Sequence, residues 1–395
     1  MRAASPAHEG GFIQVHRMHS DKKIYRILQR HLDKQAIGFP AAWSGSDIRL
    51  LERLFTYDEA KLALHLTYKP APAGQIIERA AAEFSAGQAM RLLDSMLMKG
   101  AIGWKEKDGT SHWYVLPLVI GMYEFQDGDP SPEFLNDARA YFRTLGFGRS
   151  FLAVKPSQMR TIPIPLSIPV EHHVATYDQI RTIVRESPGP FVVLPCICRR
   201  SKAMKNKPCA KTSHEETCLA FGDMAKMVLR RKHCREVSRD DVLEILRQNE
   251  EDGLVLQPAN TRQPEFVCSC CGCCCGMLSY QKFLPHPVDF WASNYYAEVS
   301  AEACAQCGTC VSRCQVGAVT LTGRSGEAKI NLSRCIGCGL CVPTCPSDAI
   351  RLKKKEPETA PPADEEALYD EVMANKKGGP EQFKMLMKVA LKMRQ

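Results

Sequence analysis

Apolar residues recur at helical spacing through the first quarter of the chain. Counting positions that fall on one face of a 3.6-residue helix predicts helices over residues 21–32, 46–54, 58–67, 75–84 and 85–99. The pattern then changes to two short arms rich in aromatic and β-branched residues, within residues 104–115. The start of the chain is therefore predicted to be a small helical domain that ends in strands.

The last predicted helix and the two arms have clear boundary signals. Ser85 is a good N-cap and Gly100 a good helix stop. Asp108-Gly109 lies centrally between the two arms and predicts a β-hairpin turn. The order helix, turn, helix, hairpin resembles a winged helix, and this resemblance implies a role in binding DNA or docking a protein.

The charge of this winged-helix-like region argues against DNA binding. The helix over 85–99 offers Arg91 and Lys99, but also Asp94 and three methionines. The hairpin tip alternates Lys105, Glu106, Lys107 and Asp108. A recognition surface for a phosphate backbone needs a basic face. We therefore expect a protein-docking role rather than binding to nucleic acid.

The middle and the end of the chain show fewer regular patterns. A helix is predicted over residues 177–186, a buried strand over 191–194 and a capped amphipathic helix over 238–253. In the last helix Lys384, Lys388 and Lys392 lie on one face beside apolar residues. Such a helix suits an ordinary solvated surface, a partner protein or peripheral contact with an anionic membrane.

Cysteines are numerous and unevenly distributed along the chain. The 395 residues include 19 cysteines, none of them before Cys196 and none after Cys345. A disulfide scaffold is a poor explanation, because the chain is long, the number is odd and no apolar leader precedes the helices. No apolar run is long enough to cross a bilayer. We expect a cytoplasmic protein whose thiols bind metal.

Positive charge accompanies the first cysteines. Residues 196–235 hold eleven Lys/Arg and three Asp/Glu, whereas the whole chain has a net charge of +8. One interpretation is a solvated basic face. The other is that this charge offsets thiolate-bound clusters and attracts an anionic partner.

The strongest motif is a repeated cysteine spacing near the C-terminal end. Cys304-x2-Cys307-x2-Cys310-x3-Cys314 recurs 31 residues later as Cys335-x2-Cys338-x2-Cys341-x3-Cys345, followed by Pro346. Zinc sites favour CxxC pairs separated by a longer loop, so zinc is the weaker alternative. Residues 297–353 resemble a bacterial-type ferredoxin with two [4Fe-4S] clusters.

The resemblance implies crossed ligation between the two halves. One cluster would take Cys304, Cys307, Cys310 and Cys345, and the other Cys335, Cys338, Cys341 and Cys314. Gln315 departs from the pattern, since the second half has Pro346 at that position. We expect this change to alter the local turn and not the ligation.

A second, less regular group of ten cysteines precedes the ferredoxin motif. Its members are Cys196, Cys198, Cys209, Cys218, Cys268, Cys270, Cys271, Cys273, Cys274 and Cys275. Neighbouring side chains on an extended chain point to opposite sides, so the dense run cannot serve one site alone. We expect at least one further iron–sulfur cluster here and as many as two. The alternative is a zinc knot with spare reactive thiols.

Other candidate ligands have weaker signals. Cys234 stands apart and is expected to be incidental. His172, His173 and His286 lie in predicted loops and are not expected to bind metal. The chain has no dinucleotide fingerprint, phosphate loop, nucleophile elbow or zinc-protease motif, so no NAD, flavin or ATP site is expected.

The predicted architecture is α+β with four parts. These are a winged-helix-like domain over residues 20–125, a mixed α/β cysteine-rich middle domain over 126–296, a ferredoxin-like domain over 297–353 and a charged helical tail over 354–395. The whole resembles multi-cluster iron–sulfur proteins of anaerobes. It favours a non-catalytic electron-transfer subunit of an oxidoreductase complex, with flavin or metal enzymes as partners.

Two other functions remain open at this point. One is a redox-sensing transcriptional regulator, in which clusters gate DNA binding by the winged helix. The other makes the cysteine-dense middle domain a catalytic centre for a small substrate.

Overall fold

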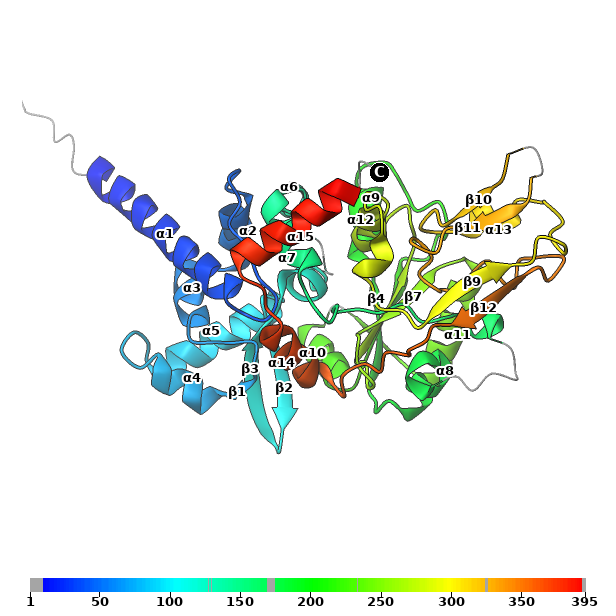
Figure 1. Ribbon diagram of the computed structural model, residues 1–395. Helices are drawn as coiled ribbons and strands as arrows, with labels where there is room; N and C mark the ends of the chain where they lie inside the picture. Colours follow the sequence, from blue (N-terminus) through cyan, green and yellow to red (C-terminus); the bar gives the residue numbers. More distant parts are fainter. Residues whose placement is uncertain are drawn as a thin grey trace, which may run out of the picture. The chain divides into compact units, whose positions relative to one another are not determined.

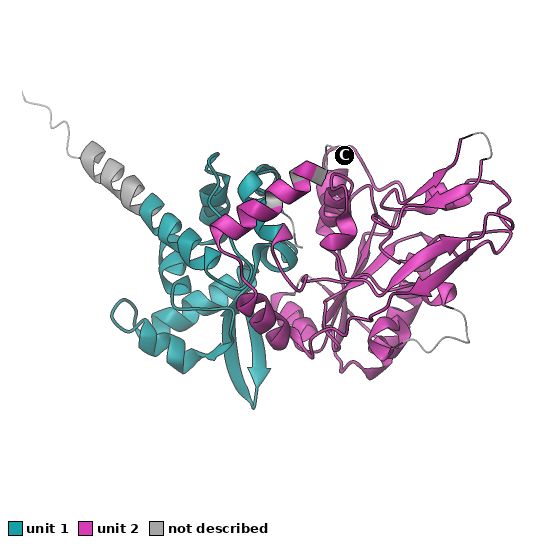
Figure 2. Cartoon of the chain, in the orientation of Figure 1, with its two compact units in different colours: residues 1–125, 130–151 teal, residues 126–129, 152–395 magenta. Residues whose placement is uncertain are grey.

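The computed structural model describes residues 10–126, 128, 130–168, 175–232, 234–323 and 326–392. His172 and His173 lie outside the described residues. The chain divides into two compact units, coloured separately in Figure 2. The first contains residues 1–125 and 130–151, and the second contains residues 126–129 and 152–395.

The first unit is mainly helical. Its helices are α1 (Gly10–Asp33), α2 (Ser46–Leu54), α3 (Tyr57–Ala63), α4 (Ala73–Arg79), α5 (Ala86–Met98), α6 (Pro132–Phe142) and α7 (Leu145–Leu152). Helix α5 begins as predicted, because Ser85 and Gln88 form a reciprocal capping box. Helices α3 and α4 are shorter than predicted, since turns occupy residues 64–65 and 80–83.

A hairpin follows α5, as the sequence predicts. Strands β2 (Ile102–Lys107) and β3 (Thr110–Val115) pair antiparallel, and β1 (Ala71–Pro72) pairs with the outer side of β3. Asp108 and Gly109 form the two-residue turn, and both have positive φ. That conformation belongs to the type I′ turn that Asp-Gly favours. The winged-helix assignment itself remains a prediction.

Residues 130–151 belong to the first unit, although the sequence groups them with the middle domain. Asp137 on α6 pairs with Arg49 and Arg53 of α2 at 2.7 and 2.8 Å. Tyr141 stacks on Phe39 with ring centroids 4.8 Å apart. These contacts join α6 to the helices that precede the hairpin.

The second unit contains a five-stranded antiparallel sheet. Its strand order is β6 (Arg235–Val237), β4 (Phe191–Pro195), β5 (Glu216–Phe221), β8 (Phe266–Cys270) and β7 (Val255–Pro258). Helices α8 (Ile180–Glu186), α9 (Ile197–Ala203), α10 (Gly222–Arg231), α11 (Arg239–Glu251) and α12 (Gly276–Gln281) connect and flank it (Figure 1). Cys196, Cys198 and the run from Cys270 to Cys275 lie where β4 and β8 pass into α9 and α12, whereas Cys218 lies within β5 and Cys268 within β8.

The repeated cysteine segment forms two short antiparallel ribbons. Strand β9 (Tyr295–Val299) pairs with β12 (Ile350–Lys354), and β10 (Val319–Leu321) pairs with β11 (Ala328–Ile330). Helix α13 (Thr309–Arg313) contains Cys310, ends just before Cys314 and precedes β10. The sequence repeat is therefore also a repeat of structure.

Backbone conformation repeats at the same spacing as the cysteines. Positive φ occurs at Gln306 and Gly337, at Gly308 and Gly339, and at Gly317 and Asp348. Each pair is 31 residues apart. The backbone of the two cysteine loops is therefore left-handed at equivalent positions.

The last two helices that the structure describes are α14 (Glu365–Ala374) and α15 (Gly379–Lys392). Lys384 and Lys388 lie on α15, and the side chain of Lys392 is outside the described residues. None of the described helices combines the length and apolar character that crossing a bilayer requires.

Candidate metal centres

The first predicted ferredoxin set surrounds one cavity. Cys304, Cys307, Cys310 and Cys345 all line it, together with apolar side chains that include Val299, Leu321 and Ile350. Cys345 comes from the second half of the repeat and the other three from the first. The structure therefore brings together the crossed set that the resemblance implies.

The second predicted set is similarly grouped. The thiols of Cys335, Cys338 and Cys341 lie close enough to one another and to Cys314 for their charges to interact. Burial is the main cause that raises the pKa of Cys341 to about 12, and the neighbouring thiols Cys335 and Cys314 add to it. Four such groups become thiolates together only when a cation compensates their charge.

Backbone amides point at these sulfurs, as thiolate ligands of iron require. Ala318 N–H donates to Cys314 Sγ at 3.1 Å, Ala297 N–H to Cys335 Sγ at 3.3 Å and Ala328 N–H to Cys304 Sγ at 3.5 Å. Hydrogen bonds to sulfur stabilise the thiolate and tune the reduction potential of a bound cluster. The residues present thus fit a pair of iron–sulfur clusters.

Six of the ten middle-domain thiols form a closed ring, which we call the six-thiol ring. Going round it, each thiol lies close enough to the next to shift its pKa, in the order Cys196, Cys198, Cys275, Cys270, Cys268, Cys218 and back to Cys196. Cys218 on β5 lies directly opposite Cys268 on β8. Cys196 and Cys275 are the N-cap residues of α9 and α12.

The other four thiols form a separate group, the thiol tetrad. Cys209, Cys271, Cys273 and Cys274 place their sulfurs within 4.8 Å of one another. The dense run over 268–275 therefore contributes to both groups, with Cys268, Cys270 and Cys275 in the ring and the other three in the tetrad. Whether a cysteine of this run belongs to the ring or to the tetrad depends on its position along β8 and the turn that follows it.

Packing separates the same two groups. Cys270 and Cys275 belong to the main hydrophobic core of the second unit, and Cys268 packs against it. Cys271 and Cys274 belong to a small separate core with Leu254, against which Cys209 and Cys273 pack. The main core also contains Cys310, Cys335 and Cys341 of the ferredoxin segment.

Gln315 joins the ferredoxin segment to the dense cysteine run. Its Oε1 accepts a hydrogen bond from Gly272 N–H at 2.9 Å, and the residue is only 4% exposed. A Cβ on Gly272 would lie 2.1 Å from the Gln315 carbonyl oxygen, so this approach requires glycine. Lys282 Nζ donates to the Gly272 carbonyl at 2.9 Å. Hydrogen bonds to both the N–H and the carbonyl of Gly272 thus hold the turn between Cys271 and Cys273 in place.

Arg199 lies beside both thiol groups. It is 4% exposed and donates to the Ser269 carbonyl at 3.0 Å. Its guanidinium interacts electrostatically with the Cys196, Cys271, Cys209 and Cys218 thiols. Burial alone would lower the pKa of Arg199, but these thiolates raise it, so the group stays cationic.

Cys209 is a thiol that its surroundings favour in the ionised form. Its partial burial disfavours the thiolate, yet N–H groups of Lys211 and Thr212 and the Arg199 guanidinium outweigh burial. Together they lower the pKa of Cys209 to about 6. A thiol of this kind is a ready metal ligand at neutral pH.

Sequence reasoning missed two of these roles. Gln315 stands out in the sequence as a departure from the repeat, but nothing there shows that its amide meets Gly272. Arg199 is one of eleven basic residues in its segment, and only the fold distinguishes it from those at the surface, such as Arg235, which pairs with Glu216 at 2.6 Å. Cys234 belongs to neither thiol group.

Comparison with known families identifies one part of the chain. Residues 294–355 match the model of the 4Fe-4S dicluster domain. This segment is a ferredoxin-type iron–sulfur domain that binds at least one [4Fe-4S] cluster. No curated protein and no solved structure matches the chain.

Proposed function

We propose that this chain is an electron-transfer protein or subunit that relays single electrons between partner oxidoreductases. Two [4Fe-4S] clusters in the ferredoxin domain and at least one further cluster in the six-thiol ring would supply the one-electron chemistry. The observation that carries the proposal is the shared core. Thiols of the ring and of both ferredoxin sets pack in one hydrophobic cluster of a single compact unit.

The chain's own residues hold and insulate these sites. Cysteines from both halves of the repeat supply ligands, and amides such as Ala297 N–H and Ala318 N–H stabilise their negative charge. Gln315 directly follows Cys314 and contacts the turn beside the ring ligand Cys270. A short, well-packed connection of this kind suits transfer between neighbouring centres.

Arg199 gives the relay a direction. Its buried positive charge lies beside Cys196 and Cys218, and a nearby cation favours the more reduced, more negative state of a site. The ring is therefore expected to have a higher reduction potential than the ferredoxin sites. Electrons entering at the ferredoxin domain would move towards the ring.

The test is a potentiometric titration of the anaerobically purified chain, followed by EPR. We expect the ferredoxin signals and at least one further signal at a higher potential. Arg199→Gln should lower that potential, Arg199→Lys should preserve it in large part, and neither should move the ferredoxin potentials appreciably. Indistinguishable potentials throughout the chain would count against the relay.

A gel-shift assay separates the relay from the redox-sensing regulator. The relay predicts no specific DNA shift in either redox state. A specific, salt-sensitive shift that depends on cluster oxidation would favour the regulator instead.

A further inference from the structure

The thiol tetrad has the dimensions of a site for one ion. Cys271 Sγ lies 3.4 Å from Cys273 Sγ and 3.5 Å from Cys209 Sγ. Cys273 Sγ lies 3.7 Å from both Cys209 Sγ and Cys274 Sγ. The remaining two separations are also no longer than 4.8 Å.

These separations match a tetrahedron around a single metal. A Zn–S bond of about 2.3 Å gives edges of about 3.8 Å between sulfurs in an ideal tetrahedron. In a cubane each cysteine binds a different iron, so the four sulfurs must lie farther apart. Among the residues that the structure describes, the ferredoxin cysteines form no group this tight, although their segment matches a [4Fe-4S] family.

We propose that Cys209, Cys271, Cys273 and Cys274 bind one Zn²⁺ ion in a closed tetrathiolate site, separate from the iron–sulfur sites. All four positions are protein thiolates, which leaves no open position for water or substrate. Closed sites of this composition are structural. The site does not depend on the electron relay and would exist whether or not the relay operates.

The surroundings suit the charge of such a site. Four thiolates and one divalent cation carry a net charge of −2. The Arg199 guanidinium and the N–H groups of Lys211 and Thr212 stabilise the negative charge of the Cys209 sulfur. Positive charge and amide donors around the ligand sulfurs are the outer contacts that thiolate sites require.

The position of the ligands indicates what the ion does. Cys209 lies in the segment between α9 and β5, which has neither helix nor strand over residues 207–215. The other three ligands lie in the turn between β8 and α12. Zinc would fasten the segment to this turn, beside the ring ligands Cys270 and Cys275 that flank it.

The first experiment measures metal and sulfide in the full chain purified without oxygen. Wild type should contain about one zinc per chain in addition to its iron and acid-labile sulfide. Cys209→Ser should lose that zinc and keep its iron and sulfide. Cys234→Ser is the matched control and should keep all three.

A second measurement distinguishes loss of the metal site from misfolding of the variant. Cells grown with Co²⁺ should give a protein with the intense visible bands of tetrahedral cobalt bound by four thiolates, and Cys273→Ser should lose them. Ferredoxin EPR signals that persist in both variants show that the fold is intact. Wild type without zinc, or a Cys209→Ser variant that loses iron, would overturn the proposal.

Discussion

At the scale of single residues, Gln315 is a position at which the two halves of the cysteine repeat differ and at which the side chain makes a structural contact. The second half of the repeat has Pro346 at this position, which cannot offer a side-chain acceptor. Gln315 accepts from Gly272 N–H in a buried place. Gln315→Leu should leave that N–H without its partner and destabilise the second unit by about 1–3 kcal/mol.

The measurement is chemical unfolding of the anaerobic protein, compared with Gln382→Leu on the tail helix α15. The Gln382 side chain donates to the nearby Lys377 carbonyl in an exposed place, so its replacement should change little. The Gln315 variant should also perturb the EPR signal of the ferredoxin site that contains Cys314. Equal stability of the two variants would show that the contact is dispensable.

Glu250 is a buried acid whose protonation should affect stability. It is 3% exposed, its Oε2 has no hydrogen-bond partner, and burial raises its pKa from 4.5 to about 7. The folded state therefore binds this proton more tightly than the unfolded state. Its unfavourable contribution is absent below pH 4.5, grows as pH rises, and is complete above pH 7.

Glu250→Gln should remove this contribution. We expect the variant to exceed wild type in unfolding free energy at pH 8 by up to about 3 kcal/mol, and to match it near pH 4.5. Urea unfolding at several pH values checks this, with the neighbouring exposed Glu251→Gln as the control. A stability difference that is independent of pH would contradict the assignment.

At the scale of elements, the sequence predicts what is local. The capping box of α5 and the Asp108-Gly109 hairpin follow from a few adjacent residues, so both appear where expected. The cysteine spacing likewise sets the ferredoxin loops. The sheet order β6-β4-β5-β8-β7 depends on pairings across long separations, which no local pattern contains. The division of the dense cysteine run depends on that sheet and could not be assigned beforehand.

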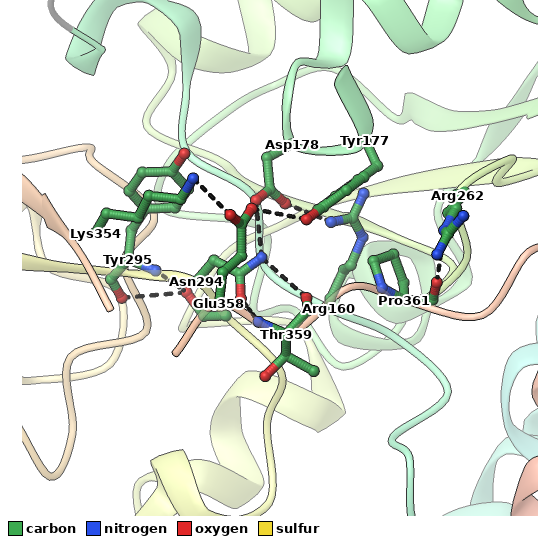
Figure 3. Close-up of polar contacts among 11 residues, drawn as sticks. Arg160, Tyr177, Asp178, Arg262, Asn294, Tyr295, Lys354, Glu358, Thr359 and Pro361 are labelled. Atoms are coloured by element: carbon green, nitrogen blue, oxygen red, sulfur yellow. Dashed lines mark hydrogen bonds and ion pairs between the residues drawn. The ribbon is translucent and has the colours of Figure 1, made fainter. Parts of the chain in front are cut away.

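A buried polar network connects three segments of the second unit (Figure 3). Arg160 pairs with Asp178, and Asn294 Nδ2 donates to Asp178 at 3.0 Å and to the Thr359 carbonyl at 3.1 Å. Tyr177 donates to Glu358, which also pairs with Lys354. The network links the residues before the sheet to both ends of the ferredoxin segment.

Removing one member of this network should be costly. Asp178→Ala would leave the Arg160 guanidinium buried without its counter-charge, which costs about 3–5 kcal/mol. The double variant Arg160→Met/Asp178→Leu should recover most of that loss, because no charge remains buried. Glu244→Ala, which breaks an exposed pair on α11, should have little effect. A double variant as unstable as the single one would contradict this account.

At the scale of the whole molecule, the two units differ in whether thiols form part of their cores. The first contains no cysteine, and residues such as Leu50, Leu93 and Trp113 form its buried interior. The second builds its main core partly from thiols, including Cys270, Cys310 and Cys335. In a core of this kind, binding of metal contributes directly to folding.

Removal of the metals should therefore unfold the units unequally. We expect oxidation with a chelator to abolish slow amide exchange over residues 191–354, because uncompensated thiols cannot remain packed as the metal-bound ligands do. Residues 46–115 should keep their protection, since their helices and hairpin are held by apolar packing, capping and ion pairs and contain no cysteine. Hydrogen exchange followed by mass spectrometry resolves the two regions in one sample. Reconstitution with iron, sulfide and zinc should restore protection in the second region, whereas zinc alone should not, because it supplies only the tetrad. Parallel loss of protection in both regions would show that the first unit also depends on the metals.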